Sequence, residues 1–86
     1  MKWELSWSND ARRDLAKLDR QVAERLVRTM TRFAETGSGD TVTLRPPLAG
    51  RRLRVGDWRV FFDVDDANSL LQVTRIYHRR EAYRDR

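Results

Sequence analysis

Residues 51–62 read RRLRVGDWRVFF, which is two short alternating runs on either side of a Gly-Asp pair. Two strand patterns separated by two residues, the first of them glycine, predict a β-hairpin with a tight type I′ or II′ turn. Counting outward from a Val55–Trp58 pair beside the turn places Arg54 opposite Arg59. The residues around the turn therefore predict how the two strands pair.

Side chains alternate between the two faces of a strand, so the hairpin has an apolar face and a basic one. The apolar face is expected to hold Leu53, Val55, Trp58, Val60 and Phe62, and the other face Arg52, Arg54, Arg59 and Phe61. Like charges directly opposite one another destabilise a sheet. The facing arginines therefore indicate a polyanionic ligand such as nucleic acid.

The whole chain is basic, and its excess charge lies in the second half. Its 86 residues include 18 Lys and Arg against 13 Asp and Glu, and 16 of the 18 are Arg. Residues 1–44 carry 8 basic and 7 acidic side chains, whereas residues 45–86 carry 10 and 6. The length predicts one domain, residues 1–86, with a single modest core. The basic second half favours an anionic partner, either nucleic acid or an acidic protein.

Composition excludes several classes of protein. The chain has no cysteine, which excludes disulfides, Cys-based zinc sites and thiol nucleophiles. Its first residues form no apolar signal segment, and no run of about 18 apolar residues follows. We therefore expect a cytoplasmic protein with no membrane partner.

The first half of the chain predicts a strand and two helices. Residues 2–7 alternate as a half-buried strand does, with both tryptophans on the apolar parity. Ser8 is a good N-cap for a first helix, and Asp19 for a longer second helix that Gly37 ends. Apolar stripes on both helices predict an antiparallel pair packed on a sheet.

The second half predicts three more strands. Residues 36–50, rich in Gly and Pro, are expected to form a surface connection with a short extended piece at Thr41–Leu44. The second hairpin strand continues to Asp65, and residues 70–77 form the last strand. Its broken alternation indicates either a central strand covered on both faces or a β-bulge. The fold class is therefore α+β: a strand, two antiparallel helices and a three-stranded antiparallel meander, β-α-α-β-β-β.

A second basic group, HRREAY at residues 78–83, follows the last strand. In a meander the end of that strand lies beside the start of the preceding one, so both basic groups belong to one site. The candidate catalytic residues are Arg52, Arg54, Arg59, Arg79 and Tyr83, and the candidate substrate-binding residues are Arg51, His78 and Arg80.

Such a site suits cleavage of an RNA phosphodiester without a metal, because guanidinium groups stabilise charge on the phosphorane oxygens. Which groups move the two protons stays open, since a free tyrosine has a pKa of about 10 and the chain has one histidine. A single histidine with scattered carboxylates has no known metal-site spacing, so no metal and no cofactor is expected. The carboxylates of residues 63–66 stand next to Asn68-Ser69 and are interpreted as turn-capping groups. The sequence has no phosphate-cradling glycine loop and no nucleophile elbow.

The run RLRVGDWRVFFDVDD, followed after the last strand by HRREAY, resembles the RelE/ParE superfamily of bacterial type II toxins. The resemblance covers nearly the whole chain. It implies a compact α+β fold and a cognate antitoxin that masks the basic face. For the RelE branch it further implies ribosome-dependent cleavage of messenger RNA in the ribosomal A site.

The same resemblance implies roles for the site residues. Arg52 and Arg54 stand where RelE-like toxins use basic residues near the scissile phosphate. Arg59 and Arg79 match two arginines that stabilise the transition state, and Tyr83 matches a terminal tyrosine that stacks on a base or assists proton transfer. Arginines replace the lysines of the best-known RelE proteins, and the spacing from Arg79 to Tyr83 is shorter than theirs.

Two other functions stay open. A ParE-like toxin would share the fold but poison DNA gyrase, and a plain nucleic-acid-binding module would grip phosphate and cleave nothing. The arginine cluster together with the terminal tyrosine favours the ribosome-dependent endoribonuclease.

Overall fold

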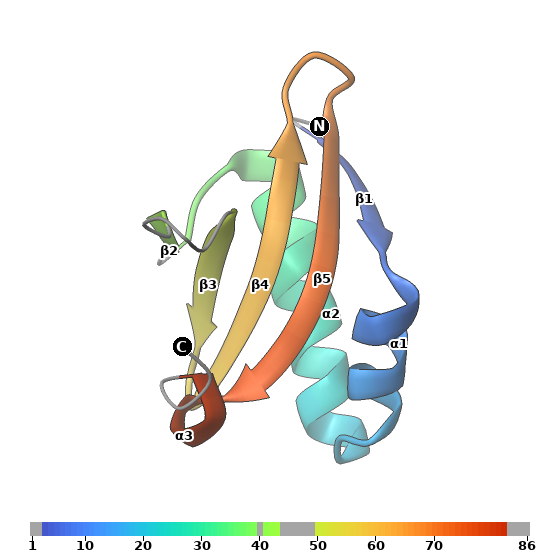
Figure 1. Ribbon diagram of the computed structural model, residues 1–86, viewed down its shortest axis with the longest axis vertical. Helices are drawn as coiled ribbons and strands as arrows, with labels where there is room; N and C mark the ends of the chain where they lie inside the picture. Colours follow the sequence, from blue (N-terminus) through green and yellow to red (C-terminus); the bar gives the residue numbers. More distant parts are fainter. Residues whose placement is uncertain (1–2, 40, 44–49, 83–86) are drawn as a thin grey trace.

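The computed structural model describes residues 3–39, 41–43 and 50–82. A five-stranded sheet has the strand order β1-β5-β4-β3-β2, and helices α1 and α2 lie on one side of it (Figure 1). The strands are β1 (Glu4–Trp7), β2 (Thr41–Thr43), β3 (Arg51–Val55), β4 (Trp58–Asp65) and β5 (Leu70–His78), and the helices are α1 (Asn9–Ala16), α2 (Arg20–Thr36) and α3 (Arg79–Ala82). The predicted α+β order is confirmed, and the sheet strand β2 and the short helix α3 add to it. Within the described ranges, no helix is long and apolar enough to cross a membrane.

The core lies between the helices and the sheet. Its buried side chains include Leu26, Met30 and Phe33 of α2, Leu53 and Val55 of β3, Val60 and Phe62 of β4, and Leu71, Val73 and Ile76 of β5. Trp58 is half-buried and packs against this cluster. The predicted apolar face of the hairpin is therefore confirmed as the face that packs on the helices.

Helices α1 and α2 begin at the predicted N-caps, and α2 ends at the predicted glycine. Ser8 Oγ accepts a hydrogen bond from the Ala11 N–H at 3.1 Å, and the Asp19 carboxylate accepts one from the Gln21 N–H at 3.1 Å. These side chains satisfy backbone donors that the first helical turn leaves free. Gly37 ends α2 with φ 74°, a left-handed conformation that suits glycine.

The β3–β4 hairpin has the predicted register. Val55 pairs with Trp58, and Arg54 pairs with Arg59. Gly56 has φ 60°, and the following turn residue has no positive φ, which is typical of a type II′ turn.

The two edge strands are β1 and β2. β1 runs parallel to β5 and pairs with Leu70–Val73. β2 runs antiparallel to β3 and forms the extended piece predicted there, although Leu44 lies outside the described residues. Because β1 ends at Trp7, no strand of the described residues pairs with the rest of β5 on that edge, and β5 meets α1 there instead.

A β-bulge explains the broken alternation of β5. Phe61 pairs with Arg75, and the next residue of β4 pairs with Val73, so Thr74 is the extra residue. The bulge puts Val73 and Ile76 on the same buried face although their spacing is odd. Of the two explanations that the sequence left open, the bulge is confirmed.

The turn between β4 and β5 is capped by a carboxylate. Asp65 accepts hydrogen bonds from the Asn68 backbone N–H at 3.2 Å and from its side-chain amide at 2.8 Å. Asp66 accepts a hydrogen bond from Trp3 Nε1 at 3.0 Å. The interpretation of these carboxylates as turn residues is therefore confirmed for Asp65, and Asp66 ties the turn to the start of the chain.

Candidate functional site

The face of the sheet away from α1 and α2 gathers arginine and aromatic side chains from three strands. Strand pairing and alternation place on it Arg52, Arg54, Arg59, Phe61, Arg75 and Tyr77, a set that we call the basic face. Arg59 is paired with Arg54 on one side and with Tyr77 on the other. Arg54 is exposed and Arg52 is half-buried. The three hairpin arginines thus lie together as the sequence predicts.

Arg59 differs from the other arginines of the basic face because it is buried, with only 6% of its surface exposed. Its Nη1 donates hydrogen bonds to the carbonyl oxygens of Gly56 at 2.9 Å and Trp58 at 3.0 Å. Among the described residues, its buried Nε has no hydrogen-bond acceptor and no carboxylate lies within ion-pair distance. The helix α3 contacts β4, the strand that carries Arg59 (Figure 1).

A buried guanidinium without a carboxylate is costly, because the ion has lost its hydration and gains no opposite charge in return. A buried donor without an acceptor adds to this cost. A phosphate oxygen would supply the opposite charge and the acceptor that Arg59 lacks. The Nε itself is buried, so a ligand reaches it only if the side chain or the residues over it move. The charge and the missing acceptor of Arg59 therefore suit an anionic ligand.

Arg79 and Arg80 begin α3, next to the hairpin turn. The Arg79 backbone N–H donates to the Asp57 carbonyl oxygen at 2.7 Å, and Arg79 Nε lies 3.8 Å from Asp57 Oδ1. The Arg79 side chain is 60% exposed, and Arg80 is also exposed. The predicted closeness of the hairpin and the chain after β5 is confirmed, with Asp57 as the link.

The structure does not bring all predicted site residues onto one face. Arg51 pairs with the buried Phe62, and His78 pairs with Trp58, so both belong by alternation to the face that packs on the helices. The His78 ring packs edge-on against the Trp58 indole, with 5.2 Å between ring centroids. Tyr83 lies outside the described residues.

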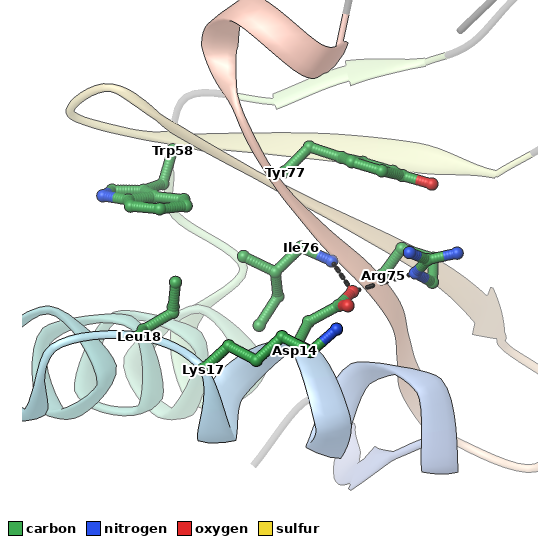
Figure 2. A pocket seen from close by; sticks show the side chains of 7 residues that line it. All are labelled: Asp14, Lys17, Leu18, Trp58, Arg75, Ile76 and Tyr77. Atoms are coloured by element: carbon green, nitrogen blue, oxygen red, sulfur yellow. Dashed lines mark hydrogen bonds and ion pairs between the residues drawn. The ribbon is translucent and has the colours of Figure 1, made fainter.

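A pocket of about 240 Å³ lies where α1 meets the end of β5 (Figure 2). Its lining consists of Asp14, Lys17, Leu18, Trp58, Arg75, Ile76 and Tyr77. Asp14 Oδ2 accepts hydrogen bonds from Arg75 Nε and from the Ile76 backbone N–H, each at 2.9 Å. The bond to Asp14 raises the pKa of Arg75 above its ordinary value, so this guanidinium is charged at any physiological pH.

Sequence reasoning missed Arg75 and Tyr77. His78 pairs with Trp58, and β4 and β5 are antiparallel, so the residue before His78 pairs with the residue after Trp58. Counting along the two strands in this way would have found Tyr77 as the neighbour of Arg59. Arg75 could not be found in this way, because regular alternation from Val73 assigns it to the apolar face and only the bulge reverses that assignment.

The fold and its basic face define a toxin of the RelE/ParE superfamily, and the comparisons with known proteins confirm this resemblance. The model of one family matches residues 5–83 and is described as the ParE toxin of the type II toxin-antitoxin system parDE. The chain therefore belongs to the ParE toxin family of type II toxin–antitoxin systems. None of the curated proteins matches the chain.

Solved structures share the fold over nearly their whole length. The RelBE2 toxin-antitoxin complex of Mycobacterium tuberculosis has a chain with 25% identity and a TM-score of 0.82, and the match covers 91% of this chain and 99% of that one. The RelE-RelB complex of Pyrococcus horikoshii gives 18% identity, a TM-score of 0.77 and coverage of 92% and 97%. The YoeB dimer of Staphylococcus aureus gives 18% identity, a TM-score of 0.68 and coverage of 91% and 99%.

Proposed function

We propose that this toxin is a ribosome-dependent endoribonuclease that cleaves mRNA in the ribosomal A site without a metal ion. The observation that carries the proposal is Arg59, a buried guanidinium on the basic face with a free Nε–H and no carboxylate partner in the described part of the chain. A phosphate diester supplies both the charge and the acceptor that this side chain lacks.

In the proposed reaction, the RNA 2′-oxygen attacks the adjacent phosphorus and the bond from phosphorus to the 5′-oxygen breaks. The 2′-hydroxyl loses a proton and the leaving 5′-oxygen gains one, which leaves a 2′,3′-cyclic phosphate and a 5′-hydroxyl. Charge builds on the non-bridging oxygens of the phosphorane, and the Arg59 fork, with Arg54 across the strand pair, stabilises it.

The other proposed roles follow the superfamily resemblance and the predicted site. Arg52 and Arg79 add positive charge near the scissile phosphate, and Tyr83 stacks on a base or assists proton transfer. Arg51, His78 and Arg80 are proposed to bind the RNA on either side of the cleaved bond.

The match to the ParE toxin family favours a second candidate, a DNA gyrase inhibitor. In that case the arginines of the basic face would contact gyrase and cleave nothing. The two candidates differ in target, so one pair of assays separates them.

The test adds purified toxin to ribosomes programmed with a defined mRNA and maps the new 5′ ends, with a gyrase supercoiling assay in parallel. Codon-phased cuts are expected from the wild type, and Arg59→Gln should lower the cleavage rate about 100-fold or more, as loss of one transition-state donor does. Arg32→Gln is the matched control, because Arg32 is an exposed arginine of α2 that lies outside the basic face. Intact mRNA together with inhibited supercoiling would contradict the proposal and favour the gyrase inhibitor.

We also propose that the protein is a cytoplasmic one-domain toxin with a cognate antitoxin as its partner. The structures of the M. tuberculosis and P. horikoshii relatives are of toxin-antitoxin complexes, which supports this partner. A small acidic reading frame beside the toxin gene is expected, and its product should co-purify with the toxin and suppress its activity. Absence of such a frame, together with no co-purifying protein, would contradict the proposed antitoxin partner.

A further inference from the structure

Two aromatic side chains, Phe61 and Tyr77, lie next to each other on the basic face, and we call this pair the aromatic patch. Their rings pack edge to face, with 5.5 Å between centroids and 89° between planes. Both residues are half-buried and lie on the face of the sheet that α1 and α2 do not cover. The patch is therefore apolar surface placed among arginines.

Tyr77, one of the two residues of the aromatic patch, is contacted by an arginine that does not belong to the patch. The Arg75 guanidinium lies 4.9 Å from the centroid of the Tyr77 ring, a distance typical of a cation–π contact. Asp14 fixes this guanidinium through the 2.9 Å bond to Nε, and Figure 2 shows the Arg75 and Tyr77 side chains extending in the same direction from β5. The Arg75 contact therefore favours this orientation of the Tyr77 ring before any ligand arrives.

The patch also adjoins the buried arginine. Tyr77 is the cross-strand partner of Arg59, and Phe61 is two residues further along β4 on the same face. Directly opposite residues of neighbouring strands lie about 4.5–5.5 Å apart. A phosphate at Arg59 would therefore place an adjoining base of the same strand within reach of the Tyr77 ring.

We propose that the aromatic patch stacks on a nucleobase of the RNA whose phosphate binds at Arg59, with Tyr77 as the principal stacking residue and Arg75 as its positioning residue. This inference deepens the proposed function and rests on it, because it takes RNA as the target. Stacking on an aromatic ring tolerates any base, so the patch fixes the position of the strand and leaves its sequence unread.

The test measures binding of an RNA trinucleotide with a 2′-deoxy sugar before each phosphate, which cannot be cleaved, to the full chain by NMR titration. Three further trinucleotides each lack one base. Tyr77→Leu keeps an apolar side chain without a π system, and Tyr77→Phe keeps the ring. The Tyr77 hydroxyl has no hydrogen bond within the described ranges, so Tyr77→Phe breaks no hydrogen bond there. Phe61→Leu is a second, independent variant, and thermal melting of every variant reports folding.

Tyr77→Leu is expected to weaken binding of the intact trinucleotide about tenfold, and Tyr77→Phe to change it less than about twofold. For one of the abasic trinucleotides, the wild type and Tyr77→Leu should bind equally, because the base that stacks is missing. Equal losses for the intact and all abasic trinucleotides would overturn the proposal, as would a Tyr77→Phe defect as large as that of Tyr77→Leu. Absence of any binding by the wild type would also overturn it.

Failure of the proposed function has a different signature. If programmed ribosomes leave mRNA intact but the base-dependent effect of Tyr77 persists, the stacking site stands and the endoribonuclease does not. A second outcome is that the wild type cleaves mRNA on ribosomes, while Tyr77→Leu changes neither the ribosome concentration that half-saturates cleavage nor the binding of the trinucleotide. In that case the endoribonuclease stands and the stacking site does not.

Discussion

Asp14→Ala is expected to destabilise the toxin by about 2–3 kcal/mol. The Asp14 side chain is 14% exposed and ties α1 to β5 beyond the point where β1 ends. Ile76 is 5% exposed, so its N–H would lose its acceptor in a buried position, which costs about 1–3 kcal/mol. The Arg75 side chain is 43% exposed, so solvent screening limits the loss of its ion pair to about 0.5–1 kcal/mol.

The assay is urea and thermal unfolding followed by circular dichroism. A loss of this size lowers the melting temperature of an 86-residue domain by about 10–15 °C. Asp14→Asn keeps an oxygen that can accept from Ile76, so it should cost only about 1 kcal/mol.

Glu24→Ala is the matched control for this prediction. Glu24 pairs with Arg20 at 3.3 Å on the exposed face of α2, with side chains 59% and 89% exposed, so its loss should cost less than about 0.5 kcal/mol. If Asp14→Ala is no more destabilising than Glu24→Ala, then Asp14 does not anchor α1 to the edge of β5 and the reasoning fails.

Three shorter predictions concern the turns and a cap. Hydrogen bonds from Asn68, chiefly from its side chain, hold the pKa of Asp65 below its ordinary value of 3.8. The ionised carboxylate therefore stabilises the fold at pH values above 3.8, and this stabilisation is lost as the pH falls through the lowered pKa. An NMR titration that gave the Asp65 carboxyl a pKa of 3.8 or more would contradict this prediction. Gly56→Ala should cost about 1–2 kcal/mol in urea unfolding, since φ is 60° and the added Cβ would lie 3.2 Å from Arg25 Nη1; an unchanged midpoint would show that the turn tolerates a side chain. Ser8→Ala should cost about 1–2 kcal/mol because it removes the N-cap of α1 and a bond to the β5 backbone, and a thermal melt within about 0.5 kcal/mol of the wild type would refute this.

Local signals account for the parts of the fold that the sequence predicted. The hairpin register follows from a two-residue turn and strict alternation, both contained in residues 51–62. The caps at Ser8 and Asp19 and the helix end at Gly37 depend on one side chain or one backbone angle each. Such features need no knowledge of distant contacts.

The parts that could not be predicted depend on contacts between distant segments. A bulge at Thr74 decides the face on which Arg75 lies, and nothing adjacent to it in the sequence fixes its position. Alternation assigns Arg59 to the open face but does not reveal that it is buried, because burial depends on which segments lie over it. The bonds from Asp14 to β5 join residues 61 and 62 positions apart in the chain. Sequence analysis therefore selected the three hairpin arginines of the basic face, but it missed Arg75 and the surroundings of Arg59.

Strand alternation also bears on the proton transfers. Histidine is the residue type best suited to proton transfer near neutral pH. The one histidine of the sequence, His78, pairs with Trp58 and packs on it, whereas Arg59 lies on the other face. The basic face itself is dominated by guanidinium groups, whose nitrogen atoms donate hydrogen bonds and accept none. A site of this kind stabilises charge on phosphorus well but supplies no strong base. The proposed reaction on free RNA should therefore be slow, and an RNA whose 2′-oxygen is already aligned with the phosphorus should react faster, since alignment lowers the part of the barrier that the arginines leave untouched. The proposed dependence on the ribosome thus follows from a site that stabilises charge with arginines and lacks a strong base.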